Sequence, residues 1–140
     1  MSMKLVWSQT MNTGIEKVDR QHRRLVDIVN GIYDAMSLGK TLKELGPPLK
    51  ELAAYTQTHF SDEVELMREI NWEGMKGHQA LHNDLTGKVK VFFARLDKGE
   101  EIDGAEMMAF LKDWLVKHIL NEDKKFGKAY ATAKNNAPVA

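Results

Sequence analysis

Apolar residues recur at intervals of three and four along four stretches of the chain, which is the spacing of one face of an α-helix. We expect helices over residues 13–38, 42–68, 72–98 and 104–130. The strict alternation of apolar and polar residues that marks a half-buried strand does not occur. Four helices of roughly 20 residues joined by short loops predict an all-α fold, an antiparallel up-down-up-down four-helix bundle.

The ends of these helices carry capping signals. A Thr or Asp followed three residues later by Glu is the capping-box pattern, and it occurs at Thr13–Glu16, Thr41–Glu44 and Asp103–Glu106. Glycines end the first and third helices, at Gly39 and Gly99, as is typical of helix C-termini.

Two segments need separate treatment. Pro47 and Pro48 would break a continuous helix, so we expect a helical turn from Thr41 and then a main helix with a proline in its first turn. Residues 131–140 are small and polar and include Pro138, which predicts a frayed tail. No linker or internal repeat divides the chain, so residues 1–140 are expected to form a single domain.

Composition excludes several classes of protein. The 20 basic residues balance the 20 acidic ones, which argues against a nucleic-acid partner. There is no cysteine, so disulfides, iron–sulfur clusters, thiolate zinc sites and cysteine nucleophiles are excluded. No apolar run is long enough to cross a bilayer, and Ser8 and Gln9 interrupt any apolar leader at the N-terminus. These features predict a cytoplasmic protein without membrane insertion.

The five histidines share one property: each falls on the apolar face of its predicted helix. A single histidine in that position is usually an ordinary core residue. Five of them, spread over all four helices, are harder to explain, because burying imidazoles without partners costs on the order of several kcal/mol. A shared metal ion would remove that cost. The residues are His22, His59, His78, His82 and His118.

Two common metal motifs do not fit. His78 and His82 are spaced i,i+4 on one helix face, but a zinc protease needs Glu after the first histidine, where this chain has Gln79. Ferritin-type di-iron bundles need Glu-x-x-His on two helices, and no Glu precedes any histidine by three residues.

The order of the remaining pattern resembles the hemerythrin family, specifically its single-domain bacterial members. The similarity spans nearly the whole chain, including Trp7 and the Asp19-Arg20-Gln21-His22 stretch. One departure is Val64, where family members often have a second Glu after the bridging one. The pattern itself reads His22, His59-x-x-x-Glu63, His78-x-x-x-His82 and His118-x-x-x-x-Asp123.

The resemblance implies a non-haem di-iron centre in the core of the bundle. It implies that His78, His82 and His118 bind one iron ion and that His22 and His59 bind the other. It also implies that Glu63 and Asp123 bridge the two, together with an oxo or hydroxo group. These ligands leave a single coordination position open, on the iron with two histidines.

An enclosed centre with one open position suits a small diatomic ligand. We therefore expect a monomeric protein that binds dioxygen reversibly, for carriage, storage or delivery to an oxygen-consuming enzyme inside a bacterial cell. An imidazole-rich donor set stabilises highly oxidised iron less well than a carboxylate-rich one, so we expect a binding protein and not an enzyme. Three alternatives remain: a di-iron redox enzyme acting on peroxide or nitric oxide, a partner-dependent oxygen sensor, and a bundle that holds zinc or manganese.

The last helix poses a problem of register. Glu122 is i+4 from His118, whereas Asp123 is i+5, about 140° around an ideal helix. Spacing alone favours Glu122 and the resemblance favours Asp123, which a local π-type widening would bring inward.

Trp114 and Leu115, one turn before His118, are expected to wall the ligand pocket, with ordinary core packing as the alternative. Glu16 and Asp19 are candidates to hydrogen-bond a ligand histidine, with solvated acids on the first helix as the commoner alternative.

Overall fold

The computed structural model describes residues 4–41 and 43–135, apart from the side chains of residues 119 and 120. A short 3-10 helix, η1 (Gln9–Met11), precedes α1 (Glu16–Ser37), α2 (Gly46–Glu69) and α3 (Met75–Asp97). The last rod is built from α4 (Gly104–Lys117), the π-helix η2 (His118–Asp123) and α5 (Lys124–Asn135) without a break. None of the described helices is long and apolar enough to cross a membrane.

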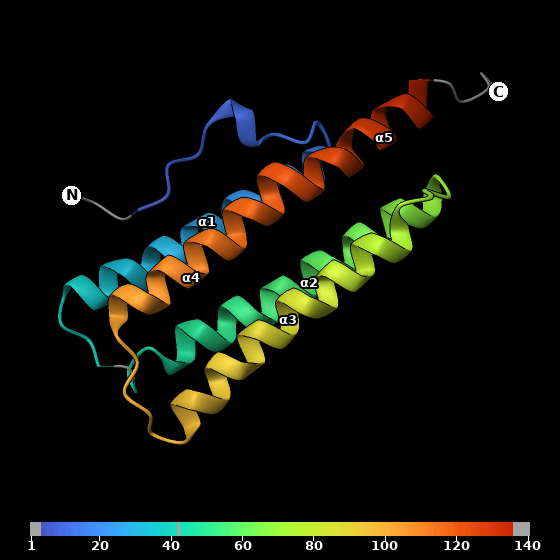
Figure 1. Cartoon of the computed structure of the whole chain (residues 1–140). Coiled ribbons are helices and arrows are strands. Elements are labelled where there is room, and N and C mark those ends of the chain that lie inside the picture. The colour runs from blue at the N-terminus through green and yellow to red at the C-terminus, as the bar shows by residue number, and fades with distance from the viewer. Residues whose placement is uncertain (1–3, 42, 136–140) are drawn as a thin grey trace.

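The four rods form an antiparallel bundle in which successive rods run in opposite directions (Figure 1). The rod of α4, η2 and α5 lies alongside α1, and α3 lies alongside α2. The predicted all-α four-helix fold is confirmed.

Two apolar clusters fill the bundle. The larger one contains Val29, Leu52 and Leu111, and the smaller one contains Val18 and Phe126. The predicted metal ligands lie where the two clusters meet: on α1, His22 follows Val18 of the smaller cluster and precedes Leu25 of the larger one. The polar centre is therefore enclosed by apolar packing at both ends.

The start of α1 differs from the sequence prediction. The helix begins at Glu16 and not at residue 13, and the expected capping box is wrong. The Asp19 carboxylate accepts hydrogen bonds from the Thr13 amide (2.7 Å), the Thr13 hydroxyl (2.8 Å) and the Gly14 amide (3.2 Å). Because Asp19 satisfies these donors from inside the helix, Glu16 stays exposed.

Asp19→Ala is expected to lower the free energy of unfolding by about 1–3 kcal/mol, because it leaves part-buried donors without an acceptor. Glu16→Ala is the matched control: its side chain is exposed, so it should change stability by less than about 0.5 kcal/mol. Urea unfolding of the metal-free proteins, followed by circular dichroism, measures both. Equal midpoints for the two variants would contradict the capping role of Asp19.

The other helix ends agree with the expectations in part. The Thr41–Glu44 capping box forms, with its two reciprocal backbone contacts at 3.2 and 3.3 Å. Residues 43–45 make a turn and α2 begins at Gly46, with prolines in its first turn. The expected start at residue 42 lies outside the described residues. Gly39 and Gly99 end their helices with positive φ angles.

Two further boundaries need correction. The box at Asp103 is only half formed, because Asp103 caps Ala105 while the Glu106 carboxylate pairs with Arg95. The expected frayed tail is wrong for residues 131–135, which continue α5. Lys134 on that last turn pairs with Glu69 at the end of α2. This contact joins the end of α5 to the end of α2, and residues 136–140 lie outside the described part.

Candidate metal centre

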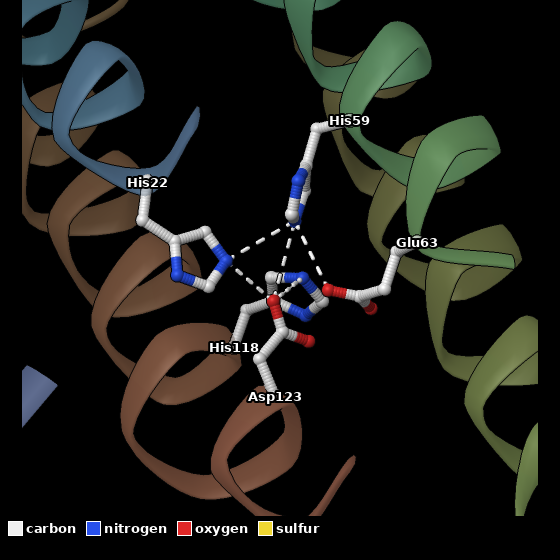
Figure 2. Close-up of side chains that lie close together, drawn as sticks. All are labelled: His22, His59, Glu63, His118 and Asp123. Atoms are coloured by element: carbon white, nitrogen blue, oxygen red, sulfur yellow. Dashed lines mark hydrogen bonds and ion pairs between the residues drawn. The ribbon is translucent and has the colours of Figure 1, made fainter. Parts of the chain in front are cut away.

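The structure brings all seven sequence-predicted ligands together in the middle of the bundle. Every one of these side chains is buried, and the side chains of His22, His59, Glu63 and Asp123 are fully inaccessible. They come from all four rods, and Figure 2 shows five of them converging on one region. The seven are His22 on α1, His59 and Glu63 on α2, His78 and His82 on α3, and His118 and Asp123 on η2.

The Glu63 carboxylate contacts imidazoles on both sides of the centre. Its Oε1 lies 2.5 Å from His78 Nε2 and 3.2 Å from His82 Nε2. Its Oε2 lies 3.3 Å from His59 Nε2. The two oxygens of one side chain therefore face two different groups of nitrogen donors.

Asp123 has the same arrangement. Its Oδ2 lies 2.5 Å from His22 Nε2, 3.2 Å from His59 Nε2 and 2.9 Å from His118 Nε2. Its Oδ1 lies 3.0 Å from His78 Nε2. Both carboxylates are thus placed to join two metal positions.

The donor atoms form two overlapping groups, each within 4.8 Å. One group holds His22 and His59, the other holds His78 and His82, and both share Glu63, His118 and Asp123. Two groups joined by two carboxylates are the arrangement that a pair of adjacent metal ions requires.

The residues fit such a pair. Imidazole nitrogens bind first-row metal ions at about 2.0–2.1 Å, which puts two donors at right angles about 3 Å apart. The contacts of 2.5–3.3 Å described above match that separation. Three of these buried atoms, Glu63 Oε2, Asp123 Oδ1 and His118 Nε2, make no hydrogen bond in the described structure. Unsatisfied buried polar atoms are costly, and metal coordination would satisfy them.

The electrostatics agree with a cation site. Burial lowers the pKa of His22 despite its contact with Asp123. Burial alone would raise the pKa of Asp123, but the surrounding imidazoles, His118 foremost, hold it well below its usual range. Burial also acts to lower the pKa of His78, yet its close contact with Asp123 and its hydrogen bond to Glu63 raise it to about 9. Asp123 is therefore ionised, and metal ions and protons compete for the same nitrogen lone pairs.

The π-helix explains how Asp123 reaches the centre. The predicted widening of the last rod is confirmed over His118–Asp123. Asp123 is fully buried, whereas Glu122 is only partly buried and lies 3.5 Å from Lys125 on the surface. The extra residue per turn rotates the i+5 side chain onto the face of His118.

The role of Gln21 was not predicted from the sequence. His59 Nδ1 donates a hydrogen bond to Gln21 Oε1 (2.8 Å), and Gln21 Nε2 donates one to Asp62 Oδ2 (2.7 Å). With Nδ1 as the donor, His59 Nε2 carries the lone pair that faces the centre. Neither acid that the sequence offered as a candidate partner fills this role: Asp19 binds Thr13 and Gly14, and Glu16 is exposed, as the alternative had it. The sequence did contain a signal for a buried Gln21: the three-four spacing places it between Val18 and Leu25 on the buried face of the helix.

Gln21→Leu is expected to weaken metal binding about 10- to 100-fold, because the orientation and tautomer of the His59 ring are no longer fixed. Gln57→Leu is the control, since Gln57 lies on α2 two residues before His59 but is exposed and bonds Thr86. Competition with a chelator measures the affinity of each variant. A chelator midpoint for Gln21→Leu equal to that of the control would contradict the positioning role.

Leu115 and Trp114 are both buried, one turn before His118. Leu115 belongs to the larger apolar cluster. Trp114 also lines an outer groove beside Ala53 and Phe93. Their expected role as walls of a ligand pocket stays a prediction.

Comparison with known proteins gives a matching family model, similar sequences and a similar solved structure. The Hemerythrin HHE cation binding domain model matches residues 13–130. The chain is 34% identical over 119 residues to a bacteriohemerythrin of Pseudomonas aeruginosa (strain LESB58), covering 85% of this chain and 76% of that protein. It is 27% identical over 120 residues to a myohemerythrin of Theromyzon tessulatum, covering 86% and 88%. A crystal structure of wild-type hemerythrin matches with a TM-score of 0.81 and 27% identity, covering 91% and 98%.

Proposed function

The chain belongs to the hemerythrin family, and from this premise we propose that its buried centre binds dioxygen reversibly at two non-haem iron ions. The observation that carries the proposal is the pair of overlapping donor groups joined by Glu63 and Asp123. A single metal ion would not need both oxygens of both carboxylates. Because the chain has this donor geometry, we infer that it shares the oxygen binding known for the family.

In the proposed centre, His22 and His59 bind one iron, and His78, His82 and His118 bind the other. Glu63 and Asp123 would hold both ions with their carboxylate oxygens, and an oxo or hydroxo group would complete the centre. When bound there, two ferrous ions would supply the electrons for reversible dioxygen binding. The chain holds the donors in position through Gln21 and excludes water with buried apolar neighbours such as Phe60, Met67 and Leu115.

The physiological role follows from the same premise. We place the protein in the cytoplasm of a bacterial cell as a monomer that carries, stores or delivers oxygen to an oxygen-consuming enzyme. Binding is favoured over catalysis because five imidazoles and two carboxylates give the centre little negative charge with which to stabilise highly oxidised iron.

Absorption spectra of purified protein with quantified metal test this function. Spectra are recorded after anaerobic reduction, after admission of air and after removal of oxygen. We expect two irons per chain and a visible band that appears with oxygen and disappears when oxygen is removed. Irreversible conversion to a ferric spectrum, turnover of added peroxide, or zinc or manganese in place of iron would each contradict the proposal.

A further inference from the structure

An open groove runs between α2 and α3 on the outer side of the metal centre. Its volume is about 910 Å³, and its lining includes His82 and Phe60. The opposite edge of His82 faces the centre, where its Nε2 lies 3.2 Å from Glu63 Oε1. One imidazole therefore connects the groove to the metal donors.

Phe60 and His82 form a stacked pair at this point. Their ring centroids are 3.8 Å apart and their planes differ by 7°. Both rings line the groove. A planar molecule in the groove would lie within van der Waals contact of a ring that also touches the centre, which is a short path for electrons.

The charges of the groove favour an anion. Arg68 and Lys90 line it from opposite ends, and neither takes part in an ion pair among the described residues. Glu65 is the one acidic side chain in the described lining, and the neighbouring position carries the apolar Val64. Arg68 lies eight residues after Phe60 on α2, and Lys90 lies eight residues after His82 on α3. Each charged residue is therefore about 12 Å along its helix from the stacked pair.

We propose that this groove binds reduced flavin mononucleotide, whose ring transfers electrons through the Phe60–His82 pair to the oxidised centre. Small-molecule sites span about 300–1,000 Å³, so the groove is large enough for a donor of this size. The ring lies against the stacked pair, and the phosphate reaches Arg68 or Lys90.

The reaction balances without another reactant. The reduced flavin loses two electrons and two protons, each ferric ion gains one electron, and the protons pass to solvent through the open groove. Oxidised flavin then dissociates. The step restores the ferrous state that binds oxygen, so this inference rests on the proposed function.

Flavin binding is tested first on the metal-free protein with oxidised flavin mononucleotide, the fluorescent form, which offers the same ring system and phosphate to the groove; binding is followed by quenching of its fluorescence. We expect saturable quenching that is at least about 10-fold weaker in the Arg68→Gln/Lys90→Gln double variant. The Lys112→Gln/Lys128→Gln variant is the control, because it removes the same charge from exposed positions outside the groove. Quenching that does not saturate, or that weakens equally in both variants, would overturn the proposal. Because no iron is present, this outcome is independent of oxygen binding.

Electron transfer is tested on the iron-loaded ferric protein by anaerobic mixing with reduced flavin mononucleotide. Val64→Trp and, separately, Asn83→Trp place a bulky side chain in the groove without altering its charge. We expect each to slow reduction at least about 10-fold, with reversible oxygen binding by the reduced protein retained. If variants that retain their iron are reduced as fast as the unmodified protein, the groove is not the route.

Discussion

Asp123→Ala is expected to abolish retention of the metal pair, whereas Glu122→Ala is expected to keep it. Asp123 contacts imidazoles from three rods of the bundle with its two oxygens. Loss of partners that only orient a ligand costs 10- to 100-fold in affinity, so loss of a bridging ligand should cost more than about 100-fold. Metal content per chain after dialysis, together with a chelator titration, measures the effect.

Glu122→Ala is a close control because it removes a carboxylate from the adjacent position of the same π-helix. The Glu122 side chain lies near Lys125 at the surface, so its removal should leave the metal content unchanged. Circular dichroism of both variants checks that the bundle still folds. If Glu122→Ala lost its metal and Asp123→Ala retained it, the assignment of the bridging residue would be reversed.

The register of these two acids shows what sequence pattern can and cannot predict. The positions of apolar residues predicted the four rods, because helical periodicity repeats over many residues and survives local irregularity. The choice between Glu122 and Asp123 depends on one extra residue in one turn. Spacing measured on an ideal helix favours Glu122 there, whereas the structure buries Asp123 among the imidazoles, and only the resemblance to a family favoured Asp123.

The helix ends and Gln21 were less predictable for a different reason. Capping depends on which side chain reaches a free amide. The Thr13 amide is bound by Asp19, six residues later in the chain, and not by Glu16. Lys134 in the last turn of α5 contacts Glu69, 65 residues earlier in the chain. Gln21 was visible as a polar residue on a buried face, but its partner His59 lies on another helix. Contacts between elements decide such details, and a single sequence does not display them.

Gly127→Ala is expected to destabilise the fold by about 1–3 kcal/mol, the usual cost of overpacking a rigid core. Gly127 is buried in α5, and an added Cβ would overlap the Thr13 carbonyl oxygen and lie 3.0 Å from its carbon. Both atoms belong to the backbone, so no side-chain rotation can relieve the contact. Urea unfolding of the metal-free protein gives the change in the free energy of unfolding.

Gly87→Ala is the matched control and should have the opposite sign. Gly87 is exposed within α3 and a Cβ there meets nothing within 4 Å, so alanine should stabilise the helix by about 0.5–1 kcal/mol.

Asp19 fixes Thr13 against α5 through two hydrogen bonds. Removing that anchor in Asp19→Ala/Gly127→Ala should let Thr13 move, so the double variant should lose less stability than the two single losses combined. Strict additivity would mean that Asp19 does not hold Thr13 in place.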